Sequence, residues 1–320
     1  MRYDKGFVLD AGDAFQLKLG ARVQTRYQWL SLDESPDREN RQAFAIQRAR
    51  IKMEGTVYDP RLTFKYQSDF GKGAVVLKDF MVTFRAADGV ELQGGQFKRP
   101  YSRHQLTSSG DLALVDRALT DKAVPAGRDV GFQMGSGRKG QPLEWDLGLF
   151  NGTGEHFVPE DFGPVLVARV GYNHNKIKGY SEADLEGGPL RFAVAANAHS
   201  ALNATTDEEA TVVAGLDALV KVQGFALLVE GHRDVDAEAT ALMAQAGYVI
   251  AEHYEPVARF AVVMPKEDAD RRQELSLGFS VYFFGHNAKW QTDFALLDKD
   301  DGEGSTLTDR QLRSQVQLSF

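Results

Sequence analysis

The chain has 320 residues, a formal net charge of −8 at pH 7 and no cysteine. The negative charge argues against nucleic acid as a partner, and the lack of cysteine excludes disulfides and cysteine-based metal sites. A mean hydropathy of −0.34, without an apolar run near 18 residues, excludes transmembrane helices. It does not exclude a membrane β-barrel, whose strands each need only about 9–11 residues.

The first predicted element follows a polar start. Segment Met1–Lys5 contains no apolar signal-peptide core, so we expect a processed chain with an added methionine. Residues 1–13 are expected to form an N-terminal extension. From Phe15 to Trp29 apolar residues alternate with polar ones, which predicts a strand with one apolar wall and one polar wall.

The same alternation recurs along the chain and predicts sixteen strands, an even number as a single-chain bacterial barrel requires. The predicted strands cover residues 15–29, 43–57, 62–70, 77–85, 90–98, 128–136, 143–151, 164–172, 190–199, 210–221, 224–233, 240–250, 254–264, 274–284, 288–297 and 310–320.

The connections between these strands alternate in length. Short turns such as Tyr58–Arg61 and Ala86–Gly89 follow even-numbered strands, whereas longer polar segments such as Ser31–Arg41 and Lys98–Gly127 follow odd-numbered ones. This rhythm is typical of an outer-membrane barrel with both termini on the periplasmic side. Segment Asn173–Gly188 departs from it, because it is long where a short turn is expected.

The last strand ends on Phe320 and resembles the closing strand of a bacterial outer-membrane barrel. A soluble β-sandwich would show the same alternation. The barrel is favoured because no linker divides the strands, and because aromatic residues such as Trp29 and Tyr172 lie near the ends of apolar faces, where lipid interfaces favour them. We therefore predict an all-β fold, a single sixteen-stranded antiparallel transmembrane β-barrel over residues 1–320.

The polar faces of the first four strands are rich in basic residues. Arginine suits bidentate contact with phosphate oxygens, lysine acts as a point charge, and a ladder of both offers an anion several sites of similar depth. However, any water-filled lumen needs polar lining, and acidic residues share these faces, mostly in later strands. The basic residues are Lys18, Arg22, Arg26, Arg48, Arg50, Lys52, Lys65 and Arg85, and the acidic ones are Glu54, Glu144, Asp146, Asp217, Glu230, Glu255, Asp293.

Other motifs give no sign of catalysis. Segment Gly135–Gly140 fits a dinucleotide-binding pattern, but it joins two strands and opens no helix, so a turn is predicted. Asp298–Glu303 resembles a calcium loop that lacks its distal glutamate, so an acidic external loop is predicted. The seven histidines are scattered. We therefore predict no enzyme activity, no metal and no cofactor.

Seven motifs occur in order between roughly residues 44 and 152. They are Ala45–Pro60, Leu77–Phe80, Gly94–Ser102, Gln105–Ser109, Leu114–Arg117, Gly127–Gly131 and Gly148–Gly152. Together they resemble the phosphate-selective porin O/P family. The resemblance implies a trimeric, water-filled outer-membrane channel with sixteen strands and a basic constriction that favours anions.

The resemblance also implies that residues 98–127 fold into the lumen as a constriction loop. Within this loop, Asp111–Asp121 has helix-like spacing. Lys98 is the best candidate for the narrowest ring, and Asp69 and Asp79 would orient or partly neutralise the basic cluster. The candidate anion-binding residues are Lys98, Arg48, Arg50, Arg22, Arg26, Lys52, Arg103, Asp69 and Asp79.

The predicted function is passive uptake of phosphate or similar small anions through a porin of the bacterial outer membrane. The expected partners are these anions, outer-membrane lipid and lipopolysaccharide, and further copies of the chain in a homotrimer. A general porin, or one permeable to cations or sugars, remains the alternative because of the acidic residues in the later strands.

Overall fold

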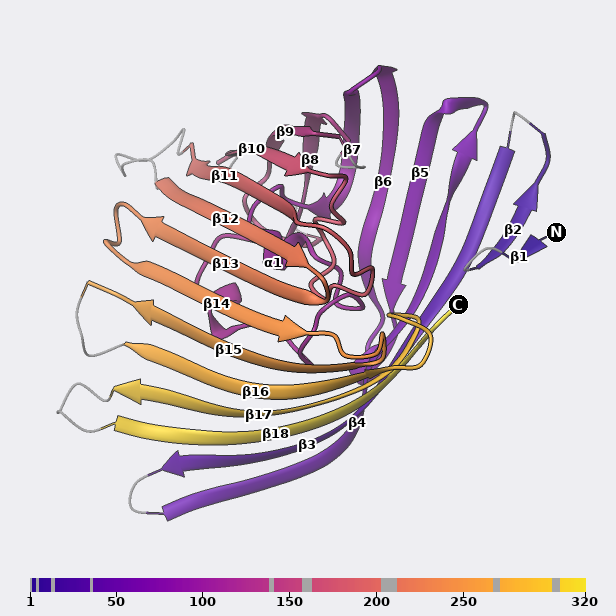
Figure 1. The fold of residues 1–320 in the computed structure, drawn as a ribbon. Helices are drawn as coiled ribbons and strands as arrows, with labels where there is room; N and C mark the ends of the chain where they lie inside the picture. The colour runs from indigo at the N-terminus through magenta and orange to yellow at the C-terminus, as the bar shows by residue number, and fades with distance from the viewer. Residues whose placement is uncertain are drawn as a thin grey trace.

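The computed structural model describes residues 2–3, 6–12, 15–34, 37–137, 141–156, 163–202, 212–266, 271–300 and 306–320. Within these ranges, sixteen long antiparallel strands follow one another around a closed barrel (Figure 1), as predicted. They are β3 (Phe15–Glu34), β4 (Asp37–Val57), β5 (Asp59–Asp69), β6 (Val76–Ala87), β7 (Val90–Lys98), β8 (Arg128–Gly135), β9 (Leu143–Phe150), β10 (Val165–His174), β11 (Arg191–Ala201), β12 (Val212–Val222), β13 (Phe225–Asp234), β14 (Thr240–Tyr248), β15 (Tyr254–Met264), β16 (Arg272–Tyr282), β17 (Ala288–Asp300) and β18 (Thr306–Ser319).

Parts of five predicted segments lie outside the described residues. They are residues 1, 4, 5 and 13 of the N-terminal extension, 35–36 of the predicted loop at residues 31–41, 138–140 of the predicted turn, 210–211 of a predicted strand and 301–303 of the acidic loop.

The barrel closes where β18 pairs with β3, from Arg22 opposite Ser319 to Ser31 opposite Arg310. The N-terminal extension contributes two short strands, β1 (Arg2–Tyr3) and β2 (Phe7–Asp10). Strand β2 pairs with residues 16–19 of β3 and so continues the line of β18 beyond the end of that strand. The first residues of β3 are therefore paired and do not form a free edge.

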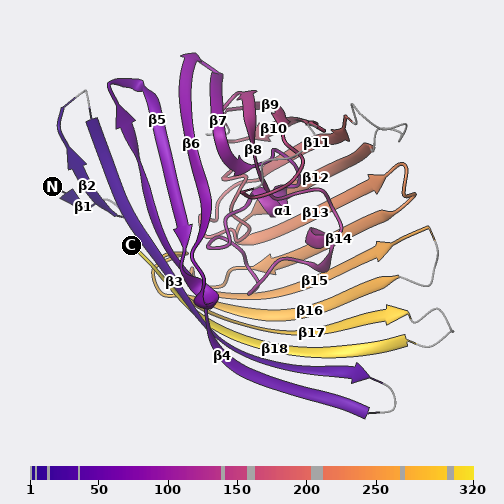
Figure 2. The same ribbon diagram turned by 180° about the vertical axis from the view of Figure 1, so that it is seen from behind.

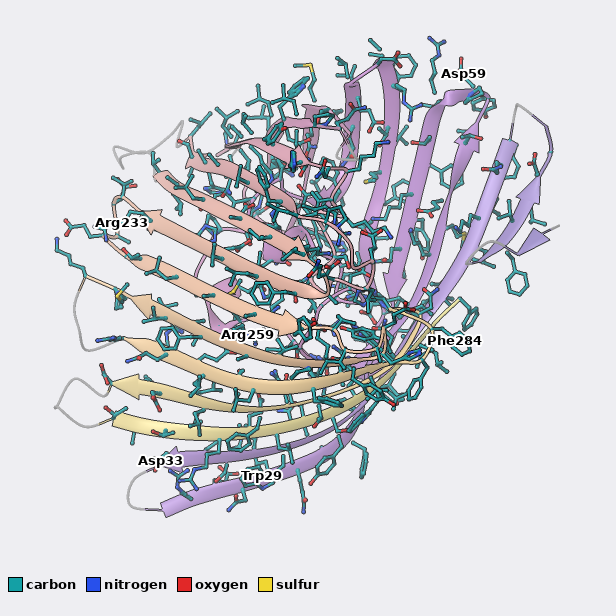
Figure 3. All side chains as sticks on the ribbon, in the orientation of Figure 1. Trp29, Asp33, Asp59, Arg233, Arg259 and Phe284 are labelled. Carbon is teal, nitrogen blue, oxygen red and sulfur yellow. The ribbon has the colours of Figure 1, made fainter. Side chains whose placement is uncertain are left out.

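The strands turn polar side chains inward and apolar side chains outward. In β15, Glu255 and Arg259 are buried, whereas Phe260 is 46% exposed; Figure 3 labels Arg259 among all the side chains. On other strands Phe132 is 77% and Leu216 is 67% exposed. A soluble sandwich would bury such side chains between its two sheets. An apolar outer wall around a polar interior is instead what a barrel surrounded by lipid requires.

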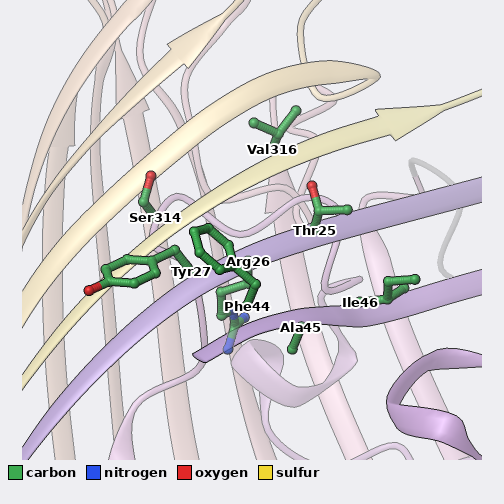
Figure 4. A pocket seen from close by; sticks show the side chains of 8 residues that line it. All are labelled: Thr25, Arg26, Tyr27, Phe44, Ala45, Ile46, Ser314 and Val316. Atoms are coloured by element: carbon green, nitrogen blue, oxygen red, sulfur yellow. The ribbon is translucent and has the colours of Figure 1, made fainter. Parts of the chain in front are cut away.

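A β-bulge interrupts the pairing of β3 with β4. Gln24 lies opposite Arg48 and the next residue, Thr25, lies opposite Ile46, so Gln47 is an extra residue. The bulge shifts the alternation of β4 by one residue, so Ile46 stays on the outer wall while Arg48 faces the lumen. On the outside it borders a shallow hollow (Figure 4) lined by Thr25, Arg26, Tyr27, Phe44, Ala45, Ile46, Ser314 and Val316.

The prediction of a loop at residues 31–41 is largely wrong, because β3 and β4 continue through most of this segment. Ser31 pairs with Asn40 and Asp33 with Arg38. Strand pairing uses backbone groups, so a run of polar side chains does not end it.

Residues 99–127 fold into the barrel between β7 and β8 (Figures 1 and 2). They contain one helical turn, α1 (Arg103–Leu106), and the 3₁₀ turn η2 (Leu119–Lys122); a further 3₁₀ turn, η1 (Gly71–Gly73), follows β5. The helix expected at residues 111–121 is wrong. Acidic side chains take the backbone N–H groups that a helix would use, since Val115 donates to Asp293 and Leu119 donates to Glu274. Among the helices of the described residues, none has the length and apolar character needed to cross a membrane.

Residues 175–190 enter the lumen from the opposite end. They join β10 to β11 at the end of the barrel that carries the short turns, which Asp59 and Phe284 mark in Figure 3. The segment is long, as the sequence indicated, and Glu182, Ala183 and Asp184 within it are only 2–3% exposed. We call residues 175–190 the inward link, and residues 99–127 the constriction loop.

Candidate functional site

The open part of the lumen lies against strands β3–β9, and the constriction loop forms its other side. The loop contributes Leu106, Ser108, Ser109 and Arg117. Among the described residues of the lining, seven side chains are basic and four are acidic. Low-permittivity walls focus the field of this excess positive charge. The basic residues are Arg50, Lys52, Lys65, Arg85, Lys98, Arg117 and Arg128, and the acidic ones are Glu54, Asp79, Glu91 and Asp146.

The constriction loop and the inward link cover much of the inner faces of the later strands, where inward side chains such as Arg169, Asp217 and Arg259 are buried. The acidic side chains there are buried, and arginines neutralise several of them, so that these acids do not face the channel. The ion pairs are Asp217 with Arg103 and Arg169, Glu144 with Arg169, Glu274 with Arg259, and Asp293 with Arg313.

Asp116 fixes the constriction loop to the strands around the barrel closure. Its carboxylate accepts hydrogen bonds from Arg26 at 2.6 Å and from Arg48 at 3.0 Å, and Arg313 lies 3.7 Å away. Burial opposes the charged form, but the three guanidinium groups hold the pKa of Asp116 below its usual value. The loop is thereby held at a defined distance from the basic wall.

Lys98 stands at the base of the constriction loop, half-buried beside the channel. Its ammonium donates to the carbonyl groups of Gln105, Leu106 and Thr107, with distances of 3.3 and 3.1 Å to the last two. Arg117 donates to the carbonyls of His104, Gln105 and Thr107. Among the described residues no carboxylate lies within 4.0 Å of Lys98. Backbone carbonyls therefore hold the ammonium of Lys98, and no described carboxylate is in direct contact with it.

Two arginines and two serine hydroxyls converge next to this position. Arg22 donates to Ser108 Oγ and to Ser109 Oγ, both at 3.0 Å, and Arg50 donates to Ser109 Oγ at 3.2 Å. The carboxylate of Asp69 accepts a hydrogen bond from Nε of Arg50 at 2.7 Å. Both hydroxyls accept from guanidinium groups. Ser108 also bonds the side chain of Asp111, so the proton of Ser109 is the one available to an anion. The Nε of Arg22 is buried and has no hydrogen-bond partner in the structure.

Asp79 organises the barrel wall next to Lys98, where Lys98 on β7 pairs with Arg128 on β8. It accepts from Lys65 at 2.9 Å and from Arg128 at 2.9 Å. On β4, Lys52 pairs with Glu54. Asp79 therefore orients two basic residues and neutralises only part of their charge.

The structure separates the nine predicted residues into three groups. Lys98, Arg50, Lys52 and Asp79 line the channel. Arg22, Arg48 and Asp69 bond to the lining residues or to the constriction loop. Arg26 and Arg103 lie away from the channel, 4% and 1% exposed, and are bonded to Asp116 and Asp217.

The prediction did not assign a role to Arg128, Ser108 or Ser109. In β8 the exposed Phe132 and Met134 have even numbers, so simple alternation would place Arg128 on the outer wall too. It turns inward at the end of the strand, where Asp79 accepts from it. The serines lie in irregular backbone without periodicity, and the motif Gln105–Ser109 was their only signal.

A family model described as phosphate-selective porin O and P matches residues 17–258 of the chain. The fold is similar to the anion-selective porin from Comamonas acidovorans, with 12% identity over 96% of this chain and 100% of that chain and a TM-score of 0.67. It is also similar to the outer membrane channel DcaP of Acinetobacter baumannii, with 11% identity over 98% and 99% of the two chains and a TM-score of 0.69. OprB of Pseudomonas putida gives 8% identity, 94% of each chain and a TM-score of 0.67.

No curated protein matches the chain. At these low identities the solved structures show a shared fold, and the family assignment depends on the family model, which covers most of the chain. The chain therefore belongs to the phosphate-selective porin O and P family and forms a channel in the bacterial outer membrane.

Proposed function

We propose that this porin is an anion-preferring channel for phosphate and similar small anions. The observation that carries the proposal is the surplus of basic over acidic side chains along the open lumen, with Lys98 at the constriction free of any carboxylate contact among the described residues. A cation crossing this point meets positive charge in a narrow space, whereas an anion is attracted.

The burial of the later acids supports anion preference over the alternative of a general or cation-permeable channel. Asp217, Glu230 and Asp293 shared the polar face in the sequence, but each is at most 7% exposed. Glu230 accepts from the backbone N–H of His104 and from the hydroxyl of Ser102. These acids hold the constriction loop in place, and the hydrogen-bond donors around them largely compensate their negative charge.

The arrangement around Arg22 and Arg50 suits a tetrahedral oxyanion. Guanidinium forks and the hydroxyl of Ser109 together match several oxygen atoms, which chloride does not have. Lys98, Lys65 and Arg128 provide further positive charge along the same wall. A phosphate ion would meet several sites of comparable depth, so it could enter and leave.

The same proposal includes a homotrimer surrounded by outer-membrane lipid and lipopolysaccharide. The outer wall carries many exposed apolar side chains, including Phe44 at 85% and Phe132 at 77%, which need lipid or another subunit around them. Gel migration before and after boiling, together with native mass spectrometry, would show whether three chains assemble.

Reversal potentials in planar bilayers under a tenfold KCl gradient test the ion preference. We expect chloride to be more permeant than potassium, and we expect phosphate added to KCl to reduce the chloride current. A potassium preference would overturn the anion channel and favour the general or cation-permeable porin. Chloride preference without phosphate block would restrict the channel to non-specific anion passage.

A further inference from the structure

The two inward segments meet in the lumen at Glu182. Its backbone N–H donates to the carbonyl of Asp111 at 3.1 Å. One carboxylate oxygen accepts from the N–H of Ala113 at 2.9 Å and from Gln245 on β14 at 2.8 Å, and the other oxygen lies 2.8 Å from Nδ1 of His104. One side chain of the inward link therefore joins two separate points of the constriction loop to the barrel wall.

His104 extends this contact to the channel side of the loop. The N–H of Ala118 donates to Nε2 of His104 at 3.0 Å, so in this geometry Nδ1 carries the proton and donates to Glu182. Ala118 follows Arg117, which lines the channel. A displacement of His104 would therefore be passed on to a charged residue of the constriction.

Other contacts of the inward link support the loop from the side away from the channel. The carbonyl of Gly179 accepts from Arg103 at 2.7 Å, and the ring of Tyr180 lies 5.2 Å from the same guanidinium. Ile177 belongs to the same buried apolar cluster as Ala118. The loop enters from the long-loop end and the link from the short-turn end, so each supplies the surface on which the other rests.

We infer that Glu182 is the positioning residue of the constriction, and that the inward link sets the width of the channel through it. Glu182 is 3% exposed, and its loss would leave the His104, Ala113 and Gln245 donors buried without an acceptor. The width of the pore would then be controlled from the short-turn end of the barrel, although the loop itself starts at the other end. The selectivity part of this inference rests on the proposed anion channel, whereas the positioning part does not.

Glu182→Ala tests the inference, with Glu186→Ala as the matched control. Glu186 lies on the same link and carries the same charge, but it is exposed and pairs with Lys178 and Arg191 rather than with the constriction loop. Hydrogen exchange followed by mass spectrometry reports the protection of loop peptides over residues 103–118. Single-channel recording reports the conductance, and gel migration before and after boiling reports the barrel.

In Glu182→Ala we expect the loop peptides to exchange about tenfold faster, since buried hydrogen bonds lose their acceptor. We also expect conductance to rise roughly twofold with added current noise as the loop moves off the basic wall. The barrel should stay folded, and Glu186→Ala should behave like the wild type. Glu182→Gln keeps one acceptor oxygen and should give intermediate values.

Unchanged exchange and conductance in a folded Glu182→Ala barrel would overturn the inference, because the loop would then be held by the wall alone. If Glu182→Ala does not fold, Glu182→Gln is compared with Glu186→Gln by the same criteria. A wild-type channel that prefers cations would refute the proposed function, but faster loop exchange in the variant would still support the positioning role. The two failures are therefore distinguishable.

Discussion

Replacing Lys98 by methionine tests whether one charge sets the ion preference of the channel. Lys98 donates to the carbonyls of Gln105, Leu106 and Thr107, but Arg117 also donates to the carbonyls of Gln105 and Thr107. Of these three carbonyls, only that of Leu106 is left without a side-chain donor in Lys98→Met. The loop should therefore keep its position, and the main change is the loss of the charge.

The size of the effect follows from the distance between Lys98 and a permeating ion. For an ion about 6 Å from Nζ, a unit charge contributes about 0.7 kcal/mol at the permittivity of water and about 2.8 kcal/mol at an effective permittivity near 20. These limits correspond to roughly threefold and hundredfold changes in the partitioning of a monovalent anion. The wet lumen places the expected value nearer the lower limit.

The assay is the permeability ratio of chloride to potassium, obtained from reversal potentials in a tenfold KCl gradient. Lys122→Met is the matched control, because Lys122 belongs to the same loop but is exposed and lies outside the channel lining. We expect the ratio to fall at least threefold in Lys98→Met and to stay at the wild-type value in Lys122→Met. Equal ratios in the two variants, with normal loop protection, would refute the role given to Lys98.

Three further predictions concern the phosphate site, the wall and pH. Ser109→Ala removes the hydroxyl shared by Arg22 and Arg50, so the phosphate concentration for half-block should rise roughly five- to tenfold; an unchanged value would place the phosphate elsewhere. In Gly95→Ala the new Cβ would lie 2.2 Å from the Phe80 carbonyl oxygen at a φ of +125°, so the temperature at which the barrel unfolds on gels should fall, and an unchanged temperature would contradict this. Burial opposes the charged form of Glu182, but His104, Ala113 and Gln245 lower its pKa from 4.5 to about 2, so its stabilisation of the loop is complete above pH 4.5 and is lost as the pH falls towards 2. Loop protection in the wild type, corrected for intrinsic exchange, should therefore approach that of Glu182→Ala only in this window. Equal protection of the two proteins at higher pH would contradict the role given to the Glu182 carboxylate.

Alternation predicted the barrel wall well, because a strand places every second residue on the same face whatever lies inside the barrel. It predicted that Arg48 and Arg50 on β4 face inward, where Arg48 bonds the constriction loop and Arg50 lines the channel. It failed where side-chain polarity was taken to mean a loop, as at residues 31–41, since a hairpin that extends past the lipid has no need of an apolar face.

The contents of the lumen could not be predicted in the same way. Arg26 and Arg48 follow the same pattern, yet Arg26 is buried against Gln315 and Asp116 while Arg48 is half-buried beside the loop. Their surroundings depend on the path of the constriction loop, which has no periodicity. The role of Glu182 was harder to predict, because it depends on contacts with His104 and Gln245, which are far away in the sequence.

The shared edge of β3 has a consequence for how the barrel closes. Strand β2 pairs with residues 16–19 of β3, and it is a near neighbour in sequence, so this pairing can form early. Strand β18 must find residues 22–31 of β3 from almost the other end of the chain. A slip of β18 by one residue would turn Arg313 towards lipid and Leu312 towards the lumen.

Because β2 already occupies the edge of β3 before Ala21, β18 cannot slide in that direction. Phe320, which follows β18, exchanges backbone hydrogen bonds with Ala21, close to where the pairing with β2 ends. The short N-terminal strand thus acts as a stop that sets the register of the seam. Deleting β2 should remove little of the barrel wall but should make the register between β18 and β3 less accurate.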